Sequence, residues 1–453
     1  PMLSEGALRG VRVVDLSWSW AGPLATRLLA DMGAEVVKIE SHRQGDWTRN
    51  LVPPDNEPGE RPWNRGAYFH KLNRNKLGMS LDLTRPEAAD AFRRLVKVSD
   101  VVVENFSPRV MVNLGLDYAA LRRLQPDIIL VSMSAYGQTG PHRDYVAYGS
   151  NVETMAGLTS MTGYEGGPPK RTPIQYGDPV GGFFGAAAVL TALHHRHLTG
   201  EGQHVDLSQC EAMTTLVGEA MLGWAMNHQA TARLGNRHPT LAPQGCYRCR
   251  GQDRWLALAV SSEEEWRGLC RALGNPAWTQ LPSFATAAGR RQHQDELDRL
   301  IEEWTAARDQ FEAMRLLQQA GVPAGAVLNN KQLLLDPHLR ERGFYVTVAQ
   351  PEAGTHLVPG LTARLSRTPG SVRQPAPAFA EHNDLVLNEL LGLNEEDAAR
   401  LASSGATARV PDDDSRLSPL AAQGMAAILQ AQVRSGHAEG MDPDYQEQLG
   451  LRA

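Results

Sequence analysis

Apolar side chains form two short runs near the start of the chain, with a helical pattern between them. Residues 10–17 and 34–40 are rich in β-branched side chains, as buried strands are. In residues 22–32 the apolar side chains recur at a spacing of three and four, and Gly33 follows as a helix C-cap. A strand, a helix and a second strand in this order commonly begin a parallel, doubly wound sheet. We therefore predict an α/β fold whose sheet starts here.

The same alternation continues as far as residue 207. Further strands are expected at residues 79–83, 100–104, 128–134 and 204–207. Further helices are expected at residues 86–98 and 118–125, with a long helical run that includes 186–193. Neither of the two common Gly-rich phosphate-binding motifs follows the first strand. The pattern predicts a Rossmann-like large domain that does not hold a dinucleotide in the usual way.

The pattern changes after residue 210. Residues 210–227 have the spacing of a helical connector, and residues 245–260 that of a β-hairpin with its turn at 250–253. The remaining expected elements are helices at 263–273, 292–308, 310–321, 332–342, 385–402 and 419–433 and strands at 322–328 and 343–349. Mixed short elements of this kind predict a small α+β domain.

These patterns give a domain organisation. The large domain is expected at residues 1–222. The small α+β domain is expected at residues 235–348. Residues 223–234 and 349–380 are expected to be linkers, since the second stretch is rich in proline.

Composition excludes several classes of protein. The 453 residues carry a formal net charge of −6, which gives no electrostatic basis for binding nucleic acid or an anionic membrane. No apolar run reaches the roughly 20 residues that span a bilayer. Four cysteines do not make a disulfide framework, and no signal-peptide pattern surrounds Glu5. We expect a cytoplasmic, soluble protein without a nucleic-acid or membrane partner.

The cysteines and histidines do not have the spacing of a metal site. Cys246 and Cys249 form a C-x-x-C motif, but Cys210 and Cys270 stand alone, so no second pair completes a zinc site. None of the fourteen histidines lies in an H-E-x-x-H motif. The nucleophile motif G-x-S-x-G is also absent. The sequence therefore predicts neither a metal nor a serine nucleophile.

Asp178 is the carboxylate with the most unusual surroundings. It lies between Gly177 and Pro179, and Gly181 and Gly182 follow before an apolar helical run. In one interpretation Asp178 caps that helix, and the spacing alone favours it because aspartate caps are common. In the other, the glycines let backbone N–H groups approach an ionised carboxylate that can attack a carbonyl carbon. The residues leave both interpretations open.

The chain resembles the family III CoA-transferases, the group of the formyl-CoA:oxalate and carnitine CoA-transferases. The resemblance runs from about residue 8 to residue 402 and rests on several ordered stretches. These are Val14–Leu16 with Ala21–Pro23, Leu29–Glu40 with Gly45–Asp46, Asn73–Lys76, Val103–Phe106, Gly177–Asp178, Thr199–Gln203, Gly235–Pro239 and Gly321–Gly325.

The resemblance implies that Asp178 is the nucleophile. CoA would pass from an acyl-CoA thioester to a carboxylic acid through an aspartyl anhydride and an aspartyl-CoA thioester. The amides of Gly177, Gly181 and Gly182 would support the carboxylate or the oxyanion. Coenzyme A thioester would be a substrate, and no cofactor would be bound permanently. The resemblance also implies a homodimer of two interlocked chains. It implies as well that the large domain uses both chain ends, so that residues 360–453 complete it.

The resemblance further implies a set of CoA contacts. They are Trp20, Ala21, Leu81, Asp82, Leu83, Asn105, Phe106, Tyr145 and Tyr148. Two basic positions of the family fall at Ser41 and Asn113, so Arg43, Arg85 or Arg109 are candidates to meet the CoA phosphates. The Gly-rich lid of formyl-CoA transferase is missing from residues 240–262.

Two alternatives share this fold. An α-methylacyl-CoA racemase would need a His-Asp dyad, and the corresponding positions are Tyr148 and Gly149. A non-catalytic CoA-binding protein would not need Gly177 and Asp178, which are both present. For the transferase, bulky Trp18 and Trp20 side chains near the predicted pocket favour an acceptor acid larger or less polar than oxalate.

Overall fold

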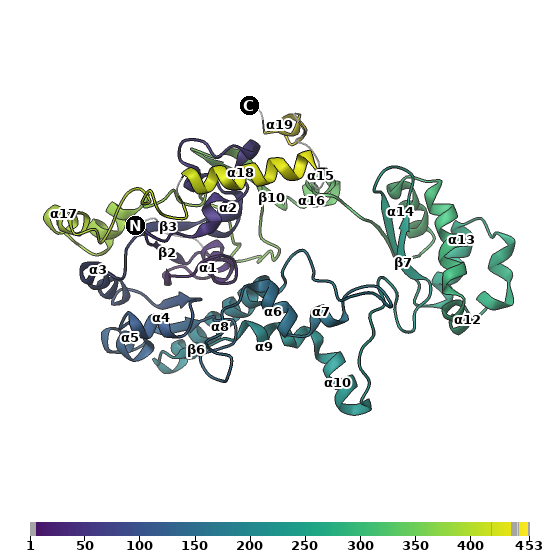
Figure 1. Cartoon of the computed structure of the whole chain (residues 1–453), viewed down its shortest axis with the longest axis horizontal. Coiled ribbons are helices and arrows are strands. Elements are labelled where there is room, and N and C mark those ends of the chain that lie inside the picture. The colour runs from purple at the N-terminus through teal and green to yellow at the C-terminus, as the bar shows by residue number, and fades with distance from the viewer. Residues whose placement is uncertain (1–5, 418, 436–441, 443, 452–453) are drawn as a thin grey trace. The chain divides into compact units, whose positions relative to one another are not determined.

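The computed structural model describes residues 6–417, 419–435, 442 and 444–451. They divide into two compact units (Figure 1). The larger unit takes the described residues up to Ala156, Pro173–Gly218 and those from Pro337 onward. The smaller unit takes Gly157–Thr172 and Glu219–Asp336. Residues 337–348, which we expected in the small domain, thus belong to the larger unit.

The larger unit contains a six-stranded parallel sheet. Its strands are β1 (Arg12–Asp15), β2 (Glu35–Glu40), β3 (Lys76–Ser80), β4 (Val101–Glu104), β5 (Ile129–Ser132) and β6 (His204–Asp206). Their order is β3-β2-β1-β4-β5-β6, which is the order of the classic doubly wound dinucleotide-binding fold. The α/β prediction is confirmed. In such sheets ligands bind beyond the carboxyl ends of the strands, where the order reverses between β1 and β4.

Helices cover both faces of this sheet, as the alternation of side chains along a strand requires. Val13 of β1 packs into a core with α1 (Ala21–Asp31) and α8 (Gly177–Thr199). The next residue, Val14, packs into the opposite core with α3 (Pro86–Val96). The latter core also includes residues of α5 (Tyr118–Leu124), the π-helical turn Leu385–Leu390 and α17 (Glu395–Ser403).

Helices α1 and α8 pack closely because α8 carries glycines at the contact. A Cβ atom on Gly182 would lie 2.8 Å from the Ala21 carbonyl oxygen, and one on Gly185 would lie 3.3 Å from Ala25 Cβ. The first position therefore needs glycine, and the second leaves little room for a side chain. The remaining α-helices described in this unit are α2 (Ala67–Asn73), α4 (Arg109–Asn113), α6 (Gly149–Met155), α9 (Gln209–Thr214), α16 (Pro337–Glu341), α18 (Pro419–Arg434) and α19 (Tyr445–Gln448).

A second, two-stranded sheet of the larger unit was only half predicted. β10 (Tyr345–Gln350) pairs antiparallel with β11 (Gly354–Pro359). The expectation of a linker over residues 349–380 is wrong for β11. Gly354 has φ +79° and begins β11 after the turn, and positive φ suits glycine.

The smaller unit is built on a three-stranded antiparallel sheet. β7 (Gln244–Arg248) and β8 (Trp255–Ala259) form the expected hairpin, and β9 (Ala324–Ala326) pairs with β8. The helices of this unit are α7 (Leu158–Met161), α10 (Gly218–Asn227), α11 (Glu263–Ala272), α12 (Ala287–Gln292), α13 (Gln294–Ala306), α14 (Gln310–Gln319) and α15 (Asn330–Leu335).

Candidate active site

Asp178 is the second residue of α8, and Tyr176 is the N-cap residue. The interpretation of Asp178 as the cap is therefore wrong. Its carboxylate instead accepts hydrogen bonds from the backbone N–H groups of Ala21 and Gly149. These are the first residues of α1 and α6, so three helix N-termini converge on one half-buried carboxylate. Helix N-termini favour negative charge.

Glycine at position 149 is what allows this approach. A Cβ atom built there would lie 2.0 Å from Asp178 Oδ2. Likewise a Cβ atom on Gly177 would lie 2.8 Å from the Gly149 carbonyl oxygen. Both contacts are shorter than real Cβ contacts, so any side chain at either position must displace the carboxylate or the backbone.

Burial and hydrogen bonding act on Asp178 in opposite directions. Burial raises the pKa of Asp178 to about 6, while the N–H groups of Ala21 and Gly149 lower it. Removal from water therefore outweighs the N–H groups at the helix ends. The carboxylate is still mainly ionised at neutral pH, and it is less well hydrated than a surface aspartate.

Tyr68 on α2 is a neighbour that the sequence did not reveal. Burial raises the pKa of its hydroxyl, and the nearby carboxylates of Asp178 and Asp46 raise it further. Its ring packs edge-to-face on Trp20, with 5.4 Å between centroids. The Lys71 ammonium lies 4.6 Å over the Trp20 ring. Tyr68 thus stays a neutral hydroxyl beside the nucleophile candidate.

The loop between β1 and α1 is held by hydrogen bonds from several side chains. Asp15 accepts hydrogen bonds from the backbone and the hydroxyl of Ser17, and Lys38 Nζ donates to the Ser17 carbonyl at 2.7 Å. The side chain of Asn105 bonds both the N–H and the carbonyl of Trp18, each at 2.8 Å. This loop leads directly into Ala21, so its rigidity fixes one of the two amides on Asp178.

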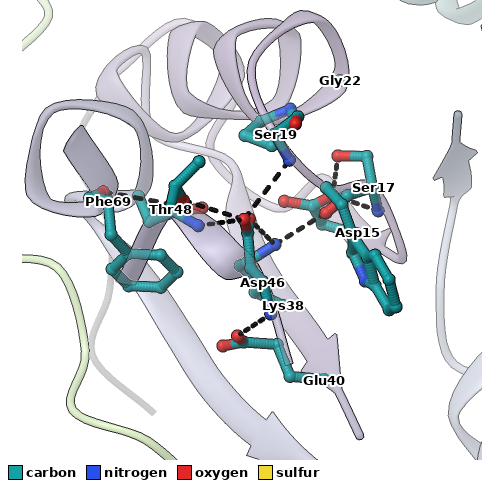
Figure 2. A network of polar contacts seen from close by, with 12 residues as sticks. Asp15, Ser17, Ser19, Gly22, Lys38, Glu40, Asp46, Thr48 and Phe69 are labelled. Atoms are coloured by element: carbon teal, nitrogen blue, oxygen red, sulfur yellow. Dashed lines mark hydrogen bonds and ion pairs between the residues drawn. The ribbon is translucent and has the colours of Figure 1, made fainter. Parts of the chain in front are cut away.

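Asp46 holds the next residue of the loop. Its Oδ1 accepts a hydrogen bond from the N–H of Ser19 at 3.3 Å and two from Thr48. Figure 2 shows Asp46 among Ser19, Thr48 and Lys38. Ser19 has φ +67°, a conformation that non-glycine residues rarely adopt, so these bonds stabilise a strained backbone.

The charges behind the loop are fully buried and paired. Lys76 Nζ lies 2.9 Å from Asp15 Oδ2, and Lys38 Nζ lies 3.4 Å from Asp46 Oδ2. Burial alone would raise the pKa of Asp15, but Lys76 and Lys38 outweigh it and lower that pKa to about 2. Burial lowers the pKa of Lys76 to about 8. Removing one partner would leave a buried charge uncompensated.

A pocket of about 730 Å³ lies at the carboxyl ends of β1 to β4. Its lining residues are Leu16, Trp18, Ile39, Ser41, Arg43, Gln44, Leu81, Asp82, Leu83, Thr84, Phe106, Ser107, Val110, Leu114 and Asp414. The volume is in the range of small-molecule and cofactor sites. Asp82 is 3% exposed, and its Oδ2 accepts no hydrogen bond within the described chain. This oxygen lies 3.7 Å from Arg43 Nη1 and 4.0 Å from Arg85 Nε, so its charge is balanced at the pocket wall.

Residues 8–383 match the model of CoA-transferase family III. The chain belongs to this family. The predicted enzyme class, a CoA-transferase, is thereby confirmed.

The fold of the chain is similar to that of solved structures. A CAIB/BAIF family protein from Brucella suis has a TM-score of 0.78 at 29% identity and covers 85% of this chain and 100% of its own. Rv3272 from M. tuberculosis has a TM-score of 0.71 at 30% identity, with 84% and 99% covered.

Three curated relatives of family III are similar over most of their length. The succinyl-CoA–D-citramalate CoA-transferase of Chloroflexus aurantiacus is 36% identical over 87% of this chain and 96% of its own. The succinate–glutarate CoA-transferase of Agrobacterium fabrum is 34% identical, over 84% and 95%. A formyl-CoA:oxalate CoA-transferase of Rhodopseudomonas palustris is 31% identical, over 89% and 97%.

The structure divides the expected CoA contacts into two groups. Leu81, Asp82, Leu83 and Phe106 line the pocket. The others lie outside its lining. Ala21 and Asn105 act through the backbone bonds described above, and Trp20 packs on Tyr68. Tyr145 is exposed and stacks on His142 at 4.6 Å, and exposed Tyr148 precedes α6.

The expected amide donors need a correction. Gly181 and Gly182 lie within α8, where a backbone N–H bonds the carbonyl four residues earlier. The groups that donate to Asp178 are instead those of Ala21 and Gly149. Sequence proximity to the carboxylate was misleading, because a helix directs these amides along its own axis. The oxyanion role of Gly177 stays a prediction.

Other expectations concern metals and membranes. Among the described residues, no group of three or more His, Cys, Asp or Glu side chains is placed to hold a metal ion. Within the same residues, no helix is long and apolar enough to cross a membrane. Arg43 lines the pocket, whereas exposed Arg85 and Arg109 do not.

Proposed function

We propose that this family III enzyme transfers CoA from an acyl-CoA thioester to a carboxylic acid, with Asp178 as the covalent nucleophile. The observation that carries the proposal is the half-buried Asp178 carboxylate, held by two backbone N–H groups at converging helix ends. Trp18 of the pocket and Ala21 of this site are three residues apart, about 10 Å of chain at most. A thioester anchored in the pocket would thus have a short path to Asp178.

The steps balance without a metal or an external reductant. Asp178 attacks the thioester carbonyl carbon, the C–S bond breaks, and CoA thiolate leaves behind a mixed anhydride. The thiolate attacks the side-chain carbonyl carbon of Asp178 and releases the donor acid as its carboxylate. The acceptor carboxylate then attacks this aspartyl-CoA thioester, and thiolate leaves again. Finally the thiolate attacks the acceptor carbonyl, which forms the new thioester and frees Asp178.

The amides of Ala21 and Gly149 have a role in these steps. When thiolate attacks the side-chain carbonyl of Asp178, one of its oxygens becomes an oxyanion. The two N–H groups that hold the carboxylate in the resting enzyme would then stabilise that oxyanion without rearrangement. Burial raises the pKa of Asp178 to about 6, so the carboxylate is already partly removed from water. It therefore has little hydration left to lose when it attacks the thioester.

We place the CoA end of the donor in the 730 Å³ pocket. The pocket lies at the switch point of the sheet, where nucleotides bind in such folds. Its apolar lining residues, which include Leu16, Ile39 and Leu81, suit a base. Arg43 is available to a phosphate, although it also lies 3.7 Å from Asp82 Oδ2.

We propose that the acceptor is an organic acid larger than oxalate. Two of the relatives are named for D-citramalate and for glutarate. The bulk of Trp18 and Trp20 near the site is in keeping with this choice. An assay tests this proposal. Donor thioesters are offered with oxalate, glutarate or citramalate, and the product thioesters are identified by mass spectrometry. Oxalate used as fast as the larger acids would contradict it.

We also propose an interlocked homodimer. Phe183, Phe184, Leu190 and Leu198 of α8 are exposed in the single chain, and Leu198 is 69% exposed. A row of large apolar side chains on a long helix is unusual for a monomer surface. The mass in solution, measured by light scattering, tests this proposal, and a monomer at working concentration would contradict it.

The racemase alternative has weaker support. Proton transfer needs a base beside Asp178, and the candidate positions hold Tyr148 and Gly149. A side chain at 149 would collide with the Asp178 carboxylate. A non-catalytic CoA-binding protein is separated from a transferase by the trapping experiment that follows.

Covalent trapping tests the proposed function. During turnover, hydroxylamine should convert the acylated side chain of Asp178 to a hydroxamate, and borohydride should reduce it to an alcohol. Peptide mapping by mass should find the change at Asp178 alone, and only when an acyl-CoA is present. Continued product formation without any adduct would exclude the mechanism.

The reaction is expected to slow as the pH falls through about 6. Burial raises the pKa of Asp178 to about 6, so the nucleophile becomes protonated there, and kcat/KM should fall about tenfold per pH unit below it. Because this folded pKa lies above the unfolded value of about 3.9, the stabilising effect of protonation is complete below that value and is lost as pH rises through 6. The pH profile of kcat/KM checks the first effect, and the pH profile of the urea midpoint, compared with that of Asp178→Asn, checks the second. A rate independent of pH between about 5 and 7 would contradict the first.

A further inference from the structure

Residues 406–417 lie beyond the part of the chain that matches the family model and run along one side of the pocket. The segment begins at the end of β3. The Asp82 N–H donates to the Ala406 carbonyl at 2.9 Å, and the Thr407 hydroxyl donates to the Ser80 carbonyl at 2.7 Å. Asp82 is itself a lining residue, so the segment is attached to the pocket wall.

The other end of the segment is attached to the loop after β2. Leu417 is fully buried, and a Cβ atom on Gly45 would lie 2.2 Å from its Cδ1. The Asn50 side-chain amide donates to the Arg416 carbonyl at 2.9 Å. Between these attachments Asp414 lines the pocket. The segment is therefore a part of the pocket and not a loose end.

Arg416 places a positive charge at this edge. Its guanidinium carbon lies 5.5 Å from the centre of the Trp18 ring, and Trp18 lines the pocket. Within the described part of the chain, no carboxylate lies close enough to pair with Arg416. Among the described residues that line the pocket, Arg43 is the one basic side chain. Its guanidinium already lies 3.7 Å from the Asp82 carboxylate.

The residues that line the pocket carry too little positive charge to bind the phosphate groups of CoA. Asp82 and Asp414 are carboxylates and Arg43 is the counter-charge, whereas CoA carries several phosphate charges at its nucleotide end. We propose that residues 406–417 complete the donor-binding site and that Arg416 pairs with a phosphate group of the bound CoA thioester. The inference rests on the proposed function for the identity of the ligand.

Substitution of Arg416 tests the inference by binding alone. The dissociation constants of CoA and of pantetheine, which lacks the phosphate groups, are measured by calorimetry for wild type, Arg416→Ala and Arg416→Lys. CoA should bind Arg416→Ala about tenfold more weakly, pantetheine should bind it as it binds wild type, and Arg416→Lys should be intermediate. Arg434→Ala removes an exposed arginine from α18 and should leave both constants unchanged.

Two results would overturn the inference. An unchanged affinity of Arg416→Ala for CoA would show that no phosphate pairs with this residue. An equal loss for CoA and pantetheine would show that Arg416 only holds Trp18. Binding needs no reaction at Asp178, so the same titrations can also be made in Asp178→Ala. This separates the two proposals. If CoA binding depends on Arg416 but the wild-type enzyme transfers no CoA, the proposed function is rejected and the binding site is kept.

Discussion

Asp178→Ala is expected to lower kcat for CoA transfer by about 10⁵-fold, the scale on which loss of a covalent nucleophile acts. Every step of the proposed reaction forms or breaks a bond to this side chain. The affinity for CoA should change little, since Asp178 is not among the residues that line the pocket. Steady-state kinetics and calorimetric titration with CoA measure the two quantities on the same preparation.

Asp178→Asn is the matched control for shape. Its amide oxygen can still accept a hydrogen bond from Ala21 or Gly149, so the fold around α8 should be kept while nucleophilic attack is lost. Both variants should therefore be inactive. At neutral pH, Asp178→Asn should unfold no earlier than wild type, because it removes an ionised carboxylate whose pKa burial raises to about 6. Transfer at a tenth of the wild-type rate or more in either variant would reject Asp178 as the nucleophile.

Asp15→Leu is expected to destabilise the larger unit by about 3–5 kcal/mol, the usual cost of leaving a buried charge without its partner. Lys76 Nζ lies 2.9 Å from Asp15 Oδ2, and both side chains are fully buried. The hydroxyls of Ser17 and Thr26 also donate to Asp15 and would lose their acceptor. The chain has two compact units, so a global unfolding curve would mix them. Urea denaturation is therefore monitored by hydrogen exchange of the β1 amides, which reports on the larger unit alone.

The double variant Asp15→Leu with Lys76→Met is the control for this prediction. It removes both charges and should recover most of the lost stability, since an apolar pair of similar size often replaces a buried ion pair without loss. The loop would still lose its Asp15 acceptor, so activity should recover less than stability does. Equal destabilisation by the single and the double variant would show that the charges themselves contribute nothing.

The strands could be predicted from sequence where the side chains on both faces are apolar. β1, β2, β4 and β5 lie within the expected runs, because parallel strands covered on both faces are almost continuous in β-branched residues. β3 begins three residues before its expected start. Its first residue is Lys76, and a lysine is expected at the surface unless a partner such as Asp15 is known to be buried with it.

The centre of the site could be predicted, but its surroundings could not. Asp178 was found from its glycines and from the family resemblance. Gly149, Ala21 and Tyr68 come from three other parts of the chain, and only the fold brings them to the carboxylate. α8 also begins nine residues before the expected apolar run, because Gly and Pro at Gly177–Gly185 disguise a helix that packs closely on α1.

The four residues from Trp18 to Ala21 connect the wall of the pocket to the backbone amide that holds Asp178. Trp18 lines the cavity, while the Ala21 amide holds Asp178, and the backbone between them is tied down by Asn105 and Asp46. A substitution in this loop that enlarges the cavity would therefore also disturb the reactive carboxylate. Variation that changes which thioester is accepted, without loss of turnover, is to be sought in residues that touch the cavity alone, such as Asp414 and Val110.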